Sequence, residues 1–203
     1  MRTTANVFQG INGGNLCEKG RFKNTFINLD RLNKPLIRRN GSLVEVTMEQ
    51  AMQEIKEKVA GNINVYISGR STNEQAELLA GLGTPLSFGI DPVAASFYSA
   101  CSGQLVTSYS DIKSADLIVA ISCDVMGGTS VPMMAARHTI RMGAKYLKAV
   151  KITDEVKNAV EQAKSPVIIL GNFFDPDILP YIAMLDAKVL IPAAKANTRG
   201  VAE

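Results

Sequence analysis

Three cysteines are the most reactive side chains of this sequence, and they lie far apart, at Cys17, Cys101 and Cys123. No two of them form a Cys-x-x-Cys pair, and His138 is the only histidine. A complete structural metal site or Fe–S cluster normally needs four such ligands. We therefore expect that this chain does not build a metal centre alone. The odd, sparse set also argues against a disulfide framework.

Cys17 differs from the other two cysteines in its surroundings. Lys19 follows it two residues later, and Gly-Arg-Phe follows at 20–22, within an aperiodic segment that contains several Gly and Asn residues. Considered alone, this segment could cap the domain. Cys101 and Cys123 have no base close in sequence, so we expect both to pack as small hydrophobic side chains.

Small residues directly follow three apolar, strand-like runs. The three transitions comprise residues 67–71, 121–129 and 170–172. In an open parallel sheet, loops that leave the carboxyl ends of strands line the ligand crevice. Small residues there let the backbone approach a phosphate at a helix N-terminus, which would describe a dinucleotide site. The alternative is that Gly and Ser only form tight turns, because neither G-x-G-x-x-G nor a P-loop pattern is present.

Local signals place the elements around these residues. Asn40-Gly41 separates two short β-prone runs and predicts a hairpin. Thr47-x-x-Gln50 predicts a capping box at a helix start. Four apolar residues behind it follow helical spacing: Met48, Met52, Ile55 and Val59.

Strand-like and helix-like segments then alternate along the chain. The predicted strands are 64–68, 116–122, 145–150, 166–170 and 188–191. A second capping box, Ser71-x-x-Glu74, predicts a helix that ends at Gly81 or Gly83. Further helices are predicted at 130–142 and 153–164, and another begins at Asp175-Pro176. Residues 85–110 are predicted to form a long loop or a pair of short helices. The fold class is therefore α/β, a parallel sheet with helices on both faces, preceded by an irregular N-terminal arm.

Composition excludes several classes of protein. Apolar residues make up 46% and charged residues 20%, which is ordinary globular usage. The net charge of +3 is small and its basic residues are mostly scattered, so no nucleic-acid surface is expected. No apolar run approaches the roughly 20 residues that span a bilayer. The first residues carry no secretory signal, so we expect a cytoplasmic protein.

The segment around Cys17 also carries a family resemblance. Residues 16–22, followed by 26–28 and 30–38, resemble the end of the Fe–S subdomain of molybdopterin oxidoreductases, and 44–51 resembles the helix start that follows it. Residues 68–74, 114–118, 163–168 and 196–200 resemble later landmarks of the family in the same order. The resemblance is strongest to the large cluster-carrying subunit of complex I and to its relatives in formate dehydrogenases and bifurcating hydrogenases.

The resemblance implies roles for individual residues. Cys17 would be the fourth ligand of a [4Fe–4S] cluster, and Lys19 would lie between that cluster and the pterin. The residues that would face a molybdopterin guanine dinucleotide are Gly69, Ser71, Asn73 and Cys123. The three earlier cysteines and the catalytic region of the family have no counterpart in this sequence. We therefore expect a cluster shared with a partner chain that supplies the other cysteines; the alternative is that Cys17 is a relic without a cluster.

These observations predict a two-part organisation and a role in a redox complex. Residues 1–46 form an arm and hairpin that resemble the end of an Fe–S subdomain, and 47–203 form an α/β domain. The leading hypothesis is an accessory or electron-transfer subunit that docks on Fe–S protein subunits and is not catalytic alone. The alternatives are a minimal formate dehydrogenase-like oxidoreductase that binds a molybdopterin guanine dinucleotide, and a nucleotide-binding regulatory module.

Overall fold

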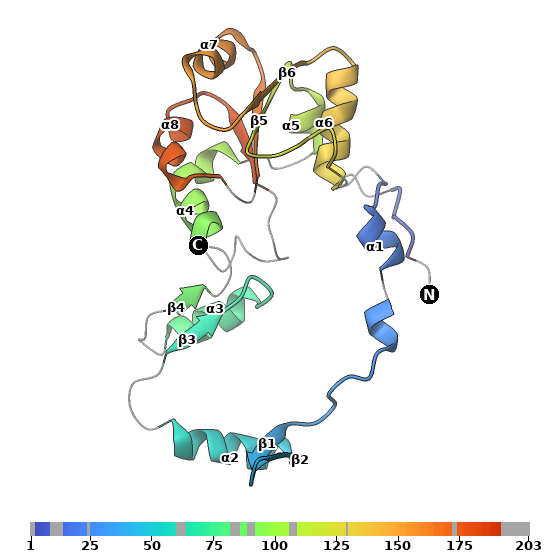
Figure 1. Cartoon of the computed structure of the whole chain (residues 1–203), viewed down its shortest axis with the longest axis vertical. Coiled ribbons are helices and arrows are strands. Elements are labelled where there is room, and N and C mark those ends of the chain that lie inside the picture. The colour runs from blue at the N-terminus through green and yellow to red at the C-terminus, as the bar shows by residue number, and fades with distance from the viewer. Residues whose placement is uncertain are drawn as a thin grey trace.

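A four-stranded parallel sheet forms the core of the upper part of the chain, as drawn in Figure 1, in the computed structural model. The structure describes residues 3–8, 14–23, 25–59, 64–81, 86–88, 92–105, 109–128, 130–171 and 174–191. The strand order is β6-β5-β7-β8, with bounds Lys145–Ala149, Leu117–Ile121, Pro166–Leu170 and Lys188–Leu190. All three strand pairs are parallel. The α/β prediction is confirmed.

Helices cover both faces of this sheet because its two central strands are apolar at every position. All ten residues of β5 and β7 are buried. Alternate side chains point to opposite faces, so each face has its own core. One core packs against α4 (Pro92–Cys101), α7 (Asp154–Gln162) and α8 (Leu179–Ala183). The other packs against α5 (Tyr109–Lys113) and α6 (Val131–Arg141).

The hairpin and the first capping box form as predicted. Strands β1 (Leu36–Arg39) and β2 (Ser42–Glu45) pair antiparallel, and Asn40 and Gly41 both have positive φ, at 50° and 84°. Two positive φ values in a two-residue loop are typical of a type I′ turn. Helix α2 (Met48–Lys58) begins at Thr47, whose hydroxyl accepts from the Gln50 backbone N–H at 3.2 Å while the Gln50 side chain accepts from Thr47 N at 3.0 Å.

The second capping box lies one residue later than the sequence predicts. The cap is Thr72 with Gln75, not Ser71 with Glu74, because the Thr72 hydroxyl accepts from Gln75 N at 3.2 Å. Helix α3 (Asn73–Ala80) ends at Gly81 as expected. The preceding strand, β3 (Val65–Ile67), pairs with β4 (Leu86–Phe88) in a separate two-stranded parallel sheet. β4 was not predicted, and Gly83 lies outside the described residues.

Short helical turns appear where the signals in the sequence are weak. The arm contains α1 (Glu18–Phe22) and the 3-10 helix η1 (Thr25–Asn28), and α4 is followed by η2 (Ser102–Gln104). Asp175 caps the 3-10 helix η3 (Pro176–Ile178), and the α-helix expected there begins only at Leu179 as α8. Within the described residues, no helix combines the length and apolar character needed to cross a membrane.

Candidate functional site

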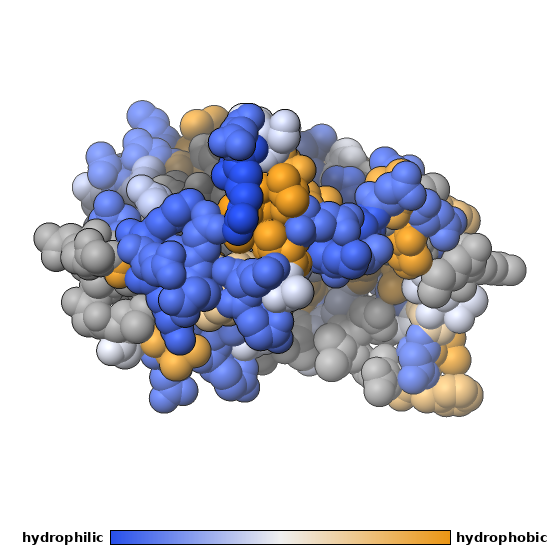
Figure 2. Space-filling view, turned by 90° about the horizontal axis from the view of Figure 1, so that it is seen from below, coloured by the Kyte–Doolittle hydropathy of each residue, from blue (hydrophilic) through white to orange (hydrophobic). Residues whose placement is uncertain are grey.

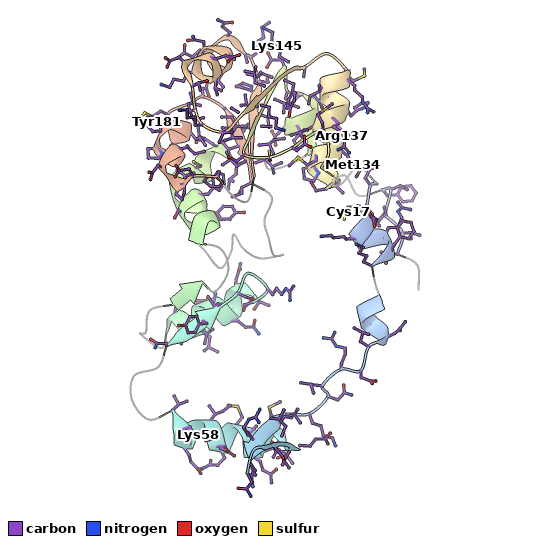
Figure 3. The ribbon with its side chains drawn as sticks, viewed as in Figure 1. Cys17, Lys58, Met134, Arg137, Lys145 and Tyr181 are labelled. Carbon is purple, nitrogen blue, oxygen red and sulfur yellow. The ribbon has the colours of Figure 1, made fainter. Side chains whose placement is uncertain are left out.

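Cys17 lies at the N-cap of α1, on the arm (Figure 3). Its Sγ accepts a hydrogen bond from the Gly20 backbone N–H at 3.4 Å. The cysteine is partly exposed and carries no disulfide. Lys19 is exposed on the same turn, and its carbonyl accepts from Lys23 N at 3.1 Å. The arm therefore presents one sulfur ligand, fixed by a backbone N–H, to its surroundings; the roles of Cys17 and Lys19 at a cluster remain predictions.

The arm around Cys17 leaves its apolar side chains uncovered. None of the residues of α1 is buried. Phe8 is 95% exposed and Leu32 is 80% exposed. The other exposed apolar residues of the arm are Val7, Phe22, Ile27 and Leu29. Large apolar side chains gathered on one exposed segment are typical of a protein-interaction surface.

The loop after β3 satisfies several of its own backbone groups. Ser71 N donates to the Ser68 carbonyl at 2.9 Å, and Arg70 N donates to the Ser68 hydroxyl at 3.3 Å. Gly69 and Ser71 are partly buried, and Asn73 is exposed in the first turn of α3. These contacts explain the turn itself; the binding role of Gly69, Ser71 and Asn73 remains a prediction.

The loop after β5 folds around the carboxylate of Asp124. That carboxylate accepts from Met126 N at 3.2 Å and from Gly127 N at 3.1 Å, and Gly128 N donates to the Asp124 carbonyl at 3.0 Å. Three N–H donors that a phosphate would use are thus engaged within the loop. From α6, the Arg137 guanidinium donates to the carbonyls of Val125 and Met126, both at 3.1 Å, and to that of Gly128.

Close packing accounts for three glycines near this loop. A Cβ at Gly127 would lie 2.5 Å from the Asp124 carboxylate, and one at Gly128 would lie 2.8 Å from the Met133 side chain. A Cβ at Gly171, after β7, would overlap the Ser122 carbonyl oxygen. At Gly171 the contact is with backbone, so packing alone requires glycine there, whereas at Gly127 and Gly128 the nearest atoms belong to side chains. Thr129 and Asn172, which belong to the predicted loops, lie outside the described residues.

Cys123 sits half-buried beneath this loop. Its thiol donates to the Ile169 carbonyl, with Sγ and the oxygen 3.4 Å apart. Burial raises the pKa of the Cys123 thiol, and the nearby Asp124 carboxylate raises it further. Because the thiolate is the form that attacks electrophiles or binds metals, the surroundings of Cys123 favour the unreactive thiol. A contact between Cys123 and a cofactor remains a prediction.

The structure distributes the predicted site residues over three places. Cys17 and Lys19 lie on the arm, Gly69, Ser71 and Asn73 follow the two-stranded sheet, and Cys123 follows the four-stranded sheet. In the part of the chain that the structure describes, no three His, Cys, Asp or Glu side chains gather as a metal site. The described residues thus offer Cys17 as a single candidate sulfur ligand, and its role at a cluster stays a prediction.

Two further residues near the β5 loop do not stand out in the sequence. In the sequence, Arg137 is only a cation beside His138, which is exposed in the structure. The role of Arg137 in holding three loop carbonyls depends on the tertiary fold. Tyr146 in β6 has a buried hydroxyl without a hydrogen-bond partner among the described residues. Burial is the largest cause that raises the pKa of Tyr146, and the charges of Asp124 and Cys123 raise it further, so the phenol lies near both residues.

The chain is similar to subunits of two kinds of oxidoreductase. It is 29% identical over 169 aligned residues to the F420-dependent formate dehydrogenase 1 subunit alpha of Methanococcus maripaludis, covering 75% of this chain and 25% of that protein. It is 32% identical over 142 residues to the F420-dependent formate dehydrogenase subunit alpha of Methanocaldococcus jannaschii, covering 63% and 21%. It is 25% identical over 208 residues to an NADH-quinone oxidoreductase subunit of Rickettsia felis, covering 85% and 31%.

These matches cover much of this chain but only part of each relative. The chain spans between about a fifth and a third of the length of these three curated relatives. No family model matches the sequence. The resemblance predicted from the sequence is nevertheless confirmed by relatives of both kinds, F420-dependent formate dehydrogenase alpha subunits and NADH-quinone oxidoreductase subunits, at modest identity and over part of each protein.

Proposed function

We propose that this chain is an electron-transfer subunit of a larger redox complex, in which Cys17 ligates a [4Fe–4S] cluster completed by a partner polypeptide. The chain does not catalyse a reaction alone. Its relatives are subunits of formate dehydrogenases and of NADH-quinone oxidoreductases. The partner is an Fe–S protein subunit of the same complex.

The position of Cys17 carries this proposal. Its sulfur is held at a helix start by the Gly20 N–H and is partly exposed, so a second polypeptide can reach it. Fe–S clusters are held by cysteine thiolates, and hydrogen bonds to those sulfurs tune the reduction potential. When bound, the cluster would supply one-electron transfer. The chain's own contribution is to place one sulfur and one N–H donor beside it.

The exposed apolar side chains of the arm supply the means of docking. Phe8 and Leu32 are almost fully exposed, and they lie on the segment that carries Cys17. Burying apolar surface on a partner is favourable by roughly 25 cal/mol per Å². Association through the arm would therefore bring the partner's cysteines to Cys17 and complete the four-thiolate set.

A nucleotide or pterin site is the alternative function, and one observation favours it. A shallow pocket of about 580 Å³ lies at the carboxyl ends of β5 and β6, where Lys148 joins Ser122, Cys123 and Asp124 in its lining. The engaged loop amides and the Asp124 carboxylate count against a phosphate there. Stabilisation of the isolated chain by guanosine diphosphate in a thermal unfolding assay would favour this alternative.

The proposed cluster is tested by iron analysis of the native complex. The complex is purified through a tag on this chain, as wild type and as Cys17→Ser, and its iron content and low-temperature EPR spectrum are measured. We expect Cys17→Ser to lower the iron content by about four atoms per complex, as loss of one [4Fe–4S] cluster requires, and to remove one EPR signal.

Cys123→Ala is the matched control, because it removes a half-buried thiol whose surroundings favour the unreactive form. We expect this variant to keep all iron and every signal. Retention of full iron and an unchanged spectrum in Cys17→Ser would show that Cys17 holds no cluster. If both variants lose iron alike, the loss reflects general damage to the complex and the assignment of the ligand to Cys17 fails.

A further inference from the structure

One face of α2 consists of apolar side chains that nothing covers in the described structure. The exposed fractions are 60% for Met48, 48% for Met52, 52% for Ile55 and 47% for Val59. Steps of four and three residues place Met48, Met52 and Ile55 on one face of α2, and Val59, the C-cap residue four positions further, continues the same row just beyond the helix end. Only Ala51 is buried in this helix. We call these four residues the α2 stripe.

Figure 2 views the molecule from the end at which α2 lies in Figure 1 and shows apolar side chains exposed between polar ones. On one side of the α2 stripe, a groove of about 440 Å³ separates the helix from β1. Glu54 forms ion pairs there with Lys58 at 2.7 Å and Arg39 at 3.7 Å. The charges on this side are therefore largely compensated within the chain.

The other edge of the stripe carries two opposite charges. Glu49 and Lys56 are seven residues apart, which is nearly two helical turns, so both border the same edge. Neither takes part in an ion pair within the described residues. The edge is thus acidic near the start of α2 and basic near its end.

We infer that the α2 stripe binds the α2 stripe of a second copy of this chain, with the two helices antiparallel. The 4-3-4 spacing is the same in both directions, so a twofold axis between Met52 and Ile55 brings each stripe residue opposite another. Such an axis places the edge with Glu49 and Lys56 of one copy against the same edge of the other copy. Glu49 of each copy then lies beside Lys56 of the other, offset by about 3 Å along the helix. This isologous contact contains two reciprocal ion pairs.

A parallel arrangement of the same helices is disfavoured by charge. In this arrangement the twofold axis runs along the helices and places the edge with Glu49 and Lys56 of one copy against the groove side of the other. On that side Glu54 is already paired with Lys58 and Arg39. The parallel arrangement also aligns the two helix dipoles side by side. Because α2 is only about 16 Å long, the antiparallel contact is smaller than a standard stable interface, and the dimer belongs to the weak, concentration-dependent class.

Analytical ultracentrifugation of the full chain tests this inference, from micromolar to near-millimolar concentration. We expect reversible dimerisation of the wild type and a monomer at all concentrations for Met52→Lys, which places a cation at the centre of the contact. Because Met52 is about half exposed, the thermal unfolding transition of this variant should match that of the wild type, which separates lost association from lost folding.

Charge reversal provides the sharper test. Glu49→Lys and Lys56→Glu each turn both ion pairs into repulsions, and each should weaken self-association roughly tenfold. An equimolar mixture of the two variants restores both pairs, so it should form heterodimers with the affinity of the wild type. Glu57→Lys is the control, because this exposed residue lies on the opposite side of α2.

Three outcomes would overturn the inference: a monomeric wild type over the whole range, equal association of Met52→Lys, or a mixture no stronger than its components. If the wild type is monomeric and Met52→Lys loses a protein that co-purifies with the wild type, the α2 stripe binds a different partner and the dimer inference fails. The iron assay on Cys17 does not involve α2, so failure of the dimer leaves the cluster proposal to be judged by its own test.

Discussion

The hairpin with α2 (residues 34–59) and the four-stranded sheet with helices α5 to α8 (residues 109–191) are built from equally clear local signals but differ in burial. In the first region, a type I′ turn and a capping box define every element, yet only Ala51 is buried. In the second, all residues of β5 and β7 are buried. Local signals therefore specify where an element forms, and burial decides how firmly it is held.

This difference has a physical cause. A capping interaction typically stabilises by about 1 kcal/mol and a surface ion pair by about 1 kcal/mol or less, whereas full burial of one large aliphatic side chain stabilises by about 1.5–3 kcal/mol. Ion pairs such as Lys34–Glu45, with both side chains mostly exposed, cannot replace an apolar core. We therefore expect residues 34–59 to open locally at lower free energy than the sheet, until a partner covers them.

Isoleucine truncation in the two regions gives the largest expected difference. Ile168, in the middle of β7, is fully buried, while Ile55 on α2 is 52% exposed. Ile168→Ala should lower the free energy of unfolding by about 2–5 kcal/mol, because it leaves a cavity in the core. Ile55→Ala should change it by less than about 0.5 kcal/mol. Urea unfolding followed by circular dichroism, at a concentration below that of self-association, measures both.

Equal losses from the two variants would break the comparison, because they would mean that α2 is held by a core of its own in solution. Ile168→Val serves as the graded control for the sheet, with an expected loss of about 0.5–1.5 kcal/mol. If Ile168→Ala and Ile168→Val lowered the free energy of unfolding equally, the result would contradict the cavity argument.

Glycine substitution gives a smaller but more local contrast. A Cβ at Gly171 meets the backbone of Ser122, at the point where β5 and β7 end side by side. Gly171→Ala should therefore cost about 1–3 kcal/mol of global stability. At Gly41, φ is +84° and the space around the residue is open. Gly41→Ala should strain only the hairpin, by about 1–2 kcal/mol.

The two effects should differ in where they are detected. Gly171→Ala should shift the cooperative unfolding transition, whereas Gly41→Ala should leave that transition in place and accelerate amide hydrogen exchange in β1 and β2 alone. Faster exchange throughout the sheet in Gly41→Ala would show that the two regions unfold together. Gly103→Ala, in open space without a positive φ, is the neutral control.

The sequence predicts the elements of both regions because their signals are local. The strand at 166–170 is placed to the residue, and Asn40-Gly41 and Thr47 mark the turn and the cap. The second capping box is misplaced because Ser71-x-x-Glu74 and Thr72-x-x-Gln75 overlap and both match the motif. Only the hydrogen bonds of the folded chain distinguish them.

Interactions between distant segments could not be predicted in the same way. The pairing of β3 with β4 outside the main sheet depends on tertiary packing that no periodicity encodes. The bonds from Arg137 to loop carbonyls join α6 to the loop after β5 and have no sequence signature. For the candidate site, the sequence singles out Cys17 as a candidate sulfur ligand, which stays a prediction, whereas the uncovered apolar side chains of the arm around it are seen only in the structure.

Asp116 gives the smallest effect and shows a polar contact within the well-buried region. Its carboxylate, at the start of β5, accepts from Lys164 N at 2.8 Å and from Ser165 N at 2.9 Å, just before β7. These two backbone hydrogen bonds lower the pKa of Asp116, Lys164 N contributing most. Because the carboxylate is exposed, we expect Asp116→Asn to cost only about 1 kcal/mol at neutral pH.

The pH dependence of this loss follows from the direction of the pKa shift. A folded-state pKa below the unfolded value of about 3.9 means that the stabilisation is complete above that pH and is lost as the pH falls through the folded pKa. Wild type and Asp116→Asn should therefore differ at pH 7 and converge in strong acid. Glu54→Gln removes a carboxylate that is paired with the flexible Lys58, and its effect should disappear in high salt, whereas that of Asp116→Asn should persist because its donors are fixed backbone groups. A salt-sensitive Asp116 would mean that this contact resembles the surface pairs of residues 34–59 rather than the sheet to which it belongs.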